Sequence, residues 1–132
     1  MSRKIRMLTG AAILAAAAFI TSANLHAAES NKETAEFMKR DHKAPKGTDP
    51  VCKKATEGKA SDAELAGLLK GYEAMCSSKP SKGDVAEWTK KCQALVAVVK
   101  SLQAKDASGP AAYKAAVNCK ACHEAHRPEK AK

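Results

Sequence analysis

CKACHEAHR, the sequence of residues 119–127, contains the pattern Cys-x-x-Cys-His, which is the attachment signature of a c-type haem. On a helix Cys119 and Cys122 lie three residues apart on one face, so both sulfurs can reach one edge of a porphyrin. His123 follows directly and can bind the iron as the proximal ligand. The alternative interpretations of the same residues are a redox pair or half of a zinc site. We expect one covalent haem c at this stretch.

The first 27 residues have the features of a secretory signal peptide. A basic start precedes an apolar, alanine-rich run from Met7 to Ile20, and Leu25-His26-Ala27 is a plausible small-residue cleavage site. The apolar run has 14 residues, fewer than the roughly 20 that a membrane span requires. We therefore expect a signal peptide over residues 1–27 and one haem-binding helical domain over residues 28–132, located in the periplasm without stable membrane insertion. A retained membrane anchor is the alternative.

The chain is basic, with a formal net charge of +9. Residues 1–27 carry three basic residues and no acidic one, so their removal leaves a charge of +6. Lysines are spread along every segment and few aromatic residues are available to stack on bases, which argues against nucleic-acid binding. A basic surface suits electrostatic docking to an acidic redox partner protein. A solvated lysine face that keeps the protein soluble explains the same pattern.

Apolar residues recur with helical spacing, and no segment alternates as a strand does. The pattern predicts helices over residues 31–43 with Asn31 as N-cap, 50–57, from a Ser61–Glu64 capping box to the turn at 79, 84–105 and 110–127. The apolar stripe of the fourth helix consists of Val85, Trp88, Cys92, Leu95, Val99 and Leu102. Short connections between amphipathic helices predict an all-α antiparallel bundle, similar to a four-helix bundle, with a short first helix and an extra short helical piece. The expected domain has four aromatic residues, so its core is small and a buried porphyrin would add apolar bulk.

The C-terminal stretch resembles that of the cytochrome c-prime family, which are exported four-helix bundles with one covalent haem near the C-terminus. The family motif Cys-x-x-Cys-His-x-x-x-Arg or Lys is matched by Cys119, Cys122, His123 and Arg127, over about the last fifth of the chain. The resemblance implies that Arg127 lies near the proximal imidazole and the haem propionates. His126 is only three residues from His123 and cannot reach the opposite face of the porphyrin, so we expect it beside a propionate or in solvent. With its short first helix, the chain looks closer to small exported monohaem bundle proteins of the same general kind.

The residue opposite His123 decides between two functions. A methionine or histidine ligand there favours electron transfer, whereas an open position admits small ligands such as nitric oxide or carbon monoxide. Met38 and His42 share one face of the first predicted helix. Met38 resembles the sixth ligand of six-coordinate relatives of cytochrome c-prime, and His42 would give bis-histidine ligation. The ordinary alternatives are that Met38 fills the core and that His42 is an exposed histidine at a helix end.

These observations predict a single-electron carrier with Met38 or His42 as the distal ligand. A gas-binding sensor or scavenger with an open distal site is the alternative. The sequence offers no evident acid–base pair beside an open site, so no enzyme is predicted.

Three further cysteines remain in the expected domain. At about 1.5 Å per residue counted from each turn, Cys76 and Cys92 would miss each other by roughly 9 Å along the helix axis, whereas Cys52 falls near the level of Cys92. In an oxidising compartment we therefore expect a Cys52–Cys92 disulfide. The alternative is that all three are small buried residues. Zinc binding is not indicated, because these cysteines lack paired ligand spacing.

Overall fold

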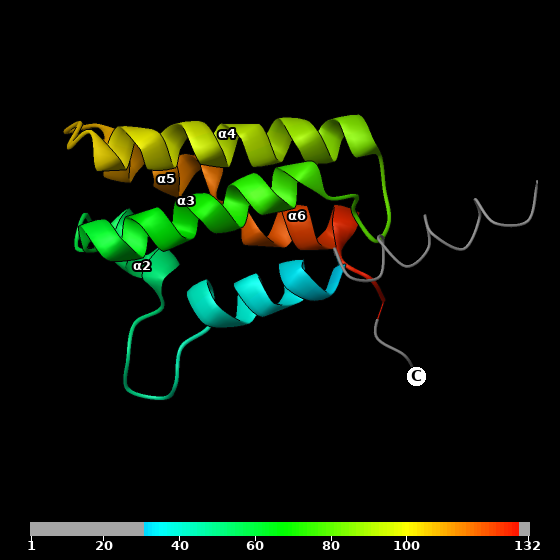
Figure 1. The fold of residues 1–132 in the computed structure, drawn as a ribbon, viewed down its shortest axis with the longest axis horizontal. Coiled ribbons are helices and arrows are strands. Elements are labelled where there is room, and N and C mark those ends of the chain that lie inside the picture. Colours follow the sequence, from blue (N-terminus) through cyan, green and yellow to red (C-terminus); the bar gives the residue numbers. More distant parts are fainter. Residues whose placement is uncertain (1–30, 130–132) are drawn as a thin grey trace, which may run out of the picture.

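A computed structural model of the chain describes residues 31–129, and all regular secondary structure within that range is helical. The helices are residues 31–41, α2 (Val51–Thr56), α3 (Asp62–Ser77), α4 (Val85–Gln103), α5 (Gly109–Ala116) and α6 (Cys119–His126), as Figure 1 shows. The predicted all-α class is confirmed. Asn31 is already helical, so the N-cap predicted at Asn31 is wrong. The predicted signal peptide and its cleavage site lie outside the described residues.

The starts of α3 and α4 follow from their capping residues. The Ser61 hydroxyl accepts a hydrogen bond from the Glu64 backbone N–H at 3.2 Å, and the Glu64 carboxylate accepts one from the Ser61 N–H at 2.8 Å. The Asp84 carboxylate accepts from the Glu87 N–H at 2.8 Å. Each contact provides a partner for an N–H group that a helix start leaves free. Both predicted caps are confirmed.

Helices α3 and α4 lie side by side and run in opposite directions (Figure 1). At one end the Trp88 indole N–H donates to the backbone oxygens of Met75 at 3.0 Å and Ser78 at 3.1 Å. At the other end Lys105, just after α4, pairs with Asp62 in the first turn of α3. The apolar faces of the two helices form most of the core, namely Leu65, Leu68, Tyr72, Met75, Trp88, Cys92, Leu95, Val99 and Leu102. These contacts fix the register of the helical pair.

Val85 does not belong to this core, although it continues the apolar stripe of α4. Its side chain is 49% exposed. Trp88 is level with the last turn of α3, so Val85, three residues earlier, lies beyond the end of that helix. The prediction that Val85 is part of the buried stripe is wrong for this reason.

The C-terminal segment forms two helices rather than the single predicted one. The backbone leaves the helical conformation at Val117, with ψ 73°, and at Asn118, with ψ 83°. The Asn118 side chain accepts a hydrogen bond from the Ala121 N–H at 3.1 Å and thereby caps a new helix. Cys119 is the first residue of α6, so the Cys-x-x-Cys-His pattern has a short helix of its own. The continuous helix predicted over 110–127 is wrong at this position.

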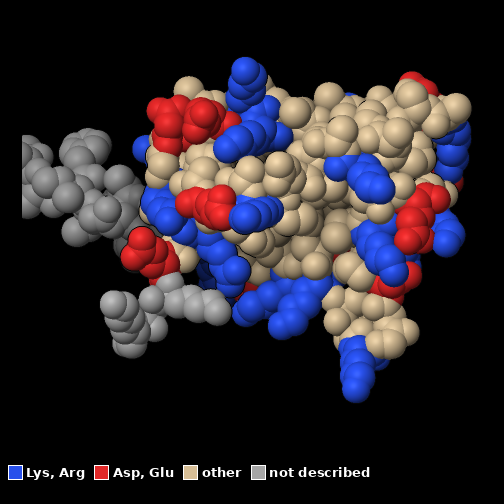
Figure 2. Space-filling view, turned by 180° about the vertical axis from the view of Figure 1, so that it is seen from behind, with Lys and Arg blue, Asp and Glu red and all other residues tan. Residues whose placement is uncertain are grey.

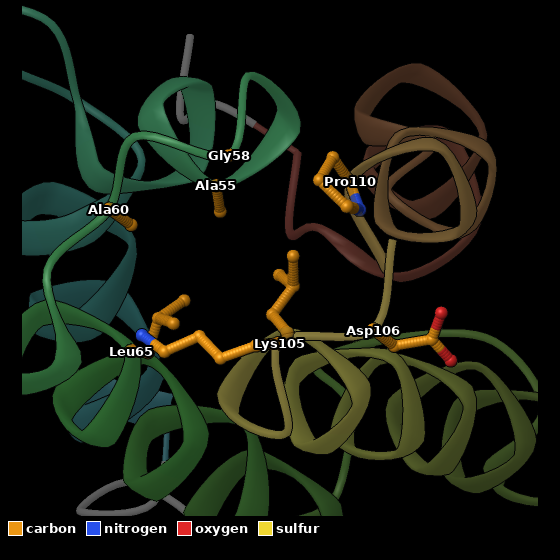
Figure 3. A pocket seen from close by; sticks show the side chains of 8 residues that line it. Ala55, Gly58, Ala60, Leu65, Lys105, Asp106 and Pro110 are labelled. Atoms are coloured by element: carbon orange, nitrogen blue, oxygen red, sulfur yellow. The ribbon is translucent and has the colours of Figure 1, made fainter. Parts of the chain in front are cut away.

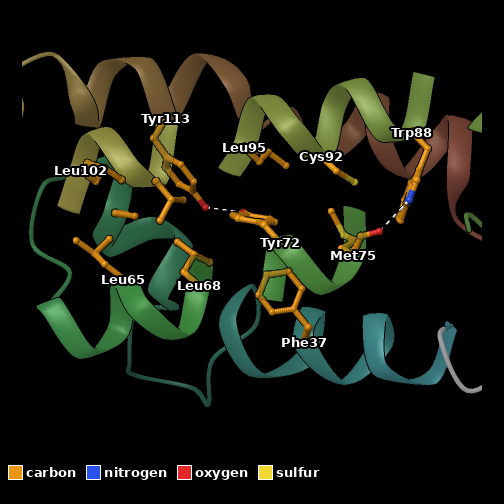
Figure 4. Close-up of a cluster of buried hydrophobic side chains, with 12 residues drawn as sticks. Phe37, Leu65, Leu68, Tyr72, Met75, Trp88, Cys92, Leu95, Leu102 and Tyr113 are labelled. Atoms are coloured by element: carbon orange, nitrogen blue, oxygen red, sulfur yellow. Dashed lines mark hydrogen bonds between the residues drawn. The ribbon is translucent and has the colours of Figure 1, made fainter. Parts of the chain in front are cut away.

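The first described helix is held close to α3 by Phe37. The Phe37 ring is buried and meets the ring of Tyr72 edge-on, with 5.1 Å between centroids, as Figure 4 shows. It also lies against Gly71, where a Cβ atom would come within 2.1 Å of the ring. The absence of a side chain at Gly71 therefore allows this close approach. The same contact brings the helix that carries Met38 and His42 up to α3.

Charged groups of both signs share the surface. In the view of Figure 2, Lys and Arg side chains occur across the face and Asp and Glu side chains lie among them. Several of these charges pair, such as Lys54 with Glu64 at 2.6 Å and Lys53 with Asp49 at 2.7 Å. Between residues 31 and 129, none of the helices combines the length and apolar character needed to cross a bilayer.

Candidate functional site

A cavity of about 400 Å³ lies between the first described helix, α3, α4 and the segment that joins α5 to α6. Five predicted site residues line it: Cys119, Cys122 and His123 from α6, and Met38 and His42 from the first helix and its end. They belong to segments more than 70 residues apart in the sequence. The structure thus brings the Cys-x-x-Cys-His motif and both candidate distal ligands to one space.

The three motif residues lie where α6 borders the cavity. Cys119 and His123 are exposed and Cys122 is half-buried. Burial raises the pKa of the Cys122 thiol, the positive charge of Lys91 works in the opposite direction, and Cys119 raises it further. Lys91 lines the same cavity from α4. Both sulfurs and the imidazole are therefore accessible from outside and adjacent to the hollow.

His42 is held in place from one side of its ring. Its Nε2 lies 2.7 Å from the Tyr72 hydroxyl, while its Nδ1 is buried and makes no hydrogen bond of normal geometry among the described residues, although the Phe37 backbone lies near the ring and raises its pKa. Burial lowers the pKa of His42 to about 4, although the neighbouring Asp41 carboxylate opposes this shift. The imidazole is therefore neutral near pH 7, and the neutral form is the one that binds a metal.

The Tyr72 hydroxyl extends this contact into the core. It lies 2.7 Å from the Tyr113 hydroxyl, and both tyrosines are completely buried. Burial is the main cause that raises the pKa of each phenol, so both stay protonated. The sequence identified Tyr72 only as part of an apolar stripe. A tyrosine on a predicted buried face suggests such a network, because a buried hydroxyl needs a hydrogen-bond partner. The signal is weak, since it does not say which residue that partner is.

Cys52 is a cavity residue that sequence reasoning missed. It lines the hollow from α2, and burial raises the pKa of its thiol, with a smaller contribution from Cys119. All five cysteines of the described range are free thiols. Cys92 lies opposite Met75, the neighbour of Cys76 (Figure 4), and the thiols of Cys76 and Cys92 are close enough to shift the pKa of one another. The proposed miss of about 9 Å between Cys76 and Cys92 is therefore wrong, and the structure gives no support to the Cys52–Cys92 pairing derived from it.

The reason for this error is the loop between α3 and α4. The count assumed that both helices start from one level at the turn. Trp88, already in the first turn of α4, is level with the last turn of α3. Cys92 lies one turn further along α4, opposite Met75, the neighbour of Cys76 (Figure 4).

His126 and Arg127 do not line the cavity. His126 is 3% exposed and meets the Trp88 ring edge-on at 5.4 Å, with its Nδ1 3.2 Å from the backbone oxygen of Lys82. The prediction of a solvent position for His126 is wrong, because this side chain docks α6 against the start of α4. Arg127 ends α6 and is exposed. Its nearness to a propionate stays a prediction.

A second cavity, of about 230 Å³, lies at the other end of the molecule between α2, α3 and the connection from α4 to α5. Figure 3 shows Ala55, Leu65 and Pro110 around it, with Lys105 and Asp106 nearby. None of the predicted site residues lines this smaller cavity. The larger cavity is therefore the candidate functional site.

Within residues 31–129, no group of three or more His, Cys, Asp or Glu side chains is arranged to hold a bare metal ion. A haem iron needs fewer ligands from the protein than a bare metal ion, because the porphyrin supplies the equatorial ligands and the chain supplies only the axial ones. No known protein family, curated protein or solved structure matches this chain.

Proposed function

We propose that the protein is an exported monohaem c-type cytochrome that transfers single electrons. The observation that carries the proposal is that one cavity is lined both by Cys119, Cys122 and His123 of α6 and by Met38 and His42 of the first described helix and its end. A six-coordinate haem needs the motif and a distal ligand at one space, and the shared lining supports that arrangement. The proposal includes the periplasmic location and the antiparallel arrangement of the whole bundle.

The residues present fit a haem in their chemistry. Cys119 and Cys122 would form the two thioether bonds, and His123 would be the proximal ligand. Haem c supplies reversible one-electron chemistry when it is bound. Apolar side chains such as Leu95 and Val117 make up much of the lining and would exclude water. Lys91 lies beside Cys122 and would offer its ammonium group to a propionate.

His42 has the stronger support of the two candidate distal ligands. Its buried Nδ1 lacks a partner, and leaving a buried polar atom unpaired costs about 1–3 kcal/mol. A metal bond would satisfy that nitrogen, while the Tyr72 hydroxyl holds the other side of the ring. Met38 is only partly buried against the core and its thioether can also turn into the cavity.

One observation supports a second candidate function. If the His42 ring, held by its 2.7 Å contact with Tyr72, does not present its Nδ1 to the iron, the distal position is open unless Met38 fills it. An open position would bind nitric oxide or carbon monoxide rather than favour electron transfer. The second candidate is therefore a gas-binding protein built on the same attachment site.

Optical spectra of the reduced protein and of two variants separate these functions. We expect a low-spin reduced spectrum that carbon monoxide changes slowly or not at all. The variant His42→Ala becomes high-spin and binds carbon monoxide rapidly, whereas Met38→Leu keeps the parent spectrum and acts as the matched control. The opposite assignment would identify Met38 as the ligand. A high-spin parent protein that binds carbon monoxide at once would contradict electron transfer.

The proposed partner is an acidic redox protein. Lys91 borders the cavity and Lys120 lies within the attachment motif, where its side chain is 86% exposed. Positive groups at the edge of a redox centre steer an acidic partner toward it, and salt screens this attraction. We expect the rate of electron exchange with an acidic partner to fall with ionic strength.

A further inference from the structure

We propose that Cys76 and Cys92 form a structural disulfide that links α3 to α4. The proposal rests on the export of the protein, which is part of the proposed function, because disulfides form and persist in oxidising compartments. It does not depend on haem attachment. It assigns a role to two cysteines that the candidate site does not use.

The register of α3 and α4 places the two residues at one level. The Trp88 indole donates to the backbone oxygens of Met75 and Ser78, so Trp88 is level with the last turn of α3. Cys92 lies four residues further along α4, on the same face. Because the helices are antiparallel, one turn forward on α4 leads back along α3, and Cys92 lies there opposite Met75, the neighbour of Cys76 (Figure 4).

The side chains meet at that level. The two thiols lie close enough for each to shift the pKa of the other: Cys92 lowers that of Cys76, and Cys76 raises that of Cys92. Cys92 is 1% exposed within the core, and Cys76 is half-buried at its edge. In Figure 4, Cys92 lies between Leu95 and Trp88 and opposite Met75, the neighbour of Cys76. The geometry thus joins two thiols from adjacent helices that hydrogen bonds already align.

Burial raises the pKa of both thiols. A thiol that is rarely ionised reacts slowly, so the folded pair is suited to a stable cross-link rather than to redox catalysis. Of the two, Cys76 is the more accessible, in the last turn of α3. It is therefore the residue that an oxidant reaches first.

The oxidant is a disulfide-bearing thiol oxidase of the exported compartment. The Cys76 thiolate attacks the disulfide of the oxidant, which forms a mixed disulfide and releases one thiolate of the oxidant. The Cys92 thiolate then attacks the sulfur of Cys76 and releases the second thiolate. The two cysteines lose two protons and two electrons, and the disulfide of the oxidant becomes a dithiol.

The pairing also protects the attachment motif. Cys52 and Cys119 lie near one another at the larger cavity, and a bond between them would block attachment at Cys119. A Cys76–Cys92 bond would remove two thiols that compete with the motif cysteines, and of these Cys92 lies near enough to Cys122 for that group to raise its pKa. Cys52 then remains as the one thiol outside both the motif and the disulfide.

Peptide mapping of the exported full-length chain tests the proposal. Trypsin places Cys52, Cys76 and Cys92 in separate peptides, at residues 47–53, 71–82 and 92–100. After alkylation in denaturant without reductant, we expect 71–82 and 92–100 as one linked pair that a phosphine reductant separates. The variant Cys52→Ser keeps the pair, and Cys76→Ser loses it and leaves Cys92 alkylated.

A second measurement makes the result independent of export. Purified reduced protein is incubated with glutathione disulfide, and we expect the same linked pair to form. Alkylation of both cysteines in exported and in treated protein, or a link between Cys52 and Cys92, would overturn the proposal. A linked pair in a chain without haem would contradict the proposed function alone, and haem in a chain with both thiols free would contradict the disulfide alone.

Discussion

The contact between Gly71 and Phe37 predicts that Gly71→Ala destabilises the protein, although alanine is the better helix former. A Cβ at Gly71 would lie 2.1 Å from two carbons of the Phe37 ring and 2.7 Å from a third. The ring cannot easily retreat, because it is 4% exposed and meets the rings of Tyr72 and His42 edge-on. The first helix must therefore shift away from α3.

The expected size follows from two opposing contributions. Overpacking a filled core costs about 1–3 kcal/mol. Replacing glycine by alanine within a helix returns roughly 0.5–1 kcal/mol. Taking the middle of each range, the net loss is about 1 kcal/mol of unfolding free energy, and each kcal/mol shifts Tm by about 4–8 °C for a domain of this size.

Gly67→Ala is the matched control, one turn earlier in α3. No atom lies within 4 Å of its added Cβ, so we expect it to gain roughly 0.5–1 kcal/mol from helix propensity alone. Thermal unfolding followed by far-UV circular dichroism compares the two variants. If Gly71→Ala is as stable as Gly67→Ala, or more so, the close packing of the first helix on α3 is refuted.

Three further variants test the framework of the site. Gly83→Ala adds a Cβ 2.5 Å from a backbone oxygen of α6 at a residue with φ +84°, whereas Gly47→Ala has a similar φ of +90° and open space. Thermal melts should therefore show the larger loss for Gly83→Ala, and equal losses would contradict the docking of α6. Tyr72→Phe leaves His42 Nε2 without its partner and should cost about 1–3 kcal/mol in urea unfolding; no change would contradict the network. Ser61→Ala should cost about 1 kcal/mol through loss of the capping box, measured in the same way, and an unchanged value would contradict that cap.

The sequence predicted those parts of the fold that depend on local chemistry. The Ser61–Glu64 capping box and the Asp84 cap each join two residues that are three apart in the sequence. The apolar stripe around Tyr72 follows helical spacing. The break before Cys119 also had a local signal, because asparagine is a favoured N-cap. The uninterrupted helical pattern from Pro110 onward outweighed that signal in the prediction.

What the sequence could not supply was the relative height of its helices. The level of Cys92 against Cys76 depends on the loop at residues 78–84 and on the two hydrogen bonds from Trp88. The burial of His126 depends on the same helix end, since its ring lies on Trp88. Both are contacts between distant segments, and no local pattern encodes them.

The candidate site shows the same division. Cys119, Cys122 and His123, the proposed attachment residues, form one local motif, so the sequence was sufficient to select them as candidates. The placement of Met38 and His42 at the same cavity depends on how closely the first helix approaches α3. Local periodicity put these two residues on one face, and only the packing shows what that face meets.

Covalent haem content tests the central claim most directly. The full-length chain is produced with export and cytochrome c maturation, then analysed by intact mass and by a pyridine haemochrome assay after acid–acetone extraction. We predict one haem per chain that resists extraction, is lost when Cys119 and Cys122 are both replaced by alanine, and is kept in Cys52→Ala. A chain without covalent haem, or one whose haem survives replacement of both motif cysteines, would contradict the account.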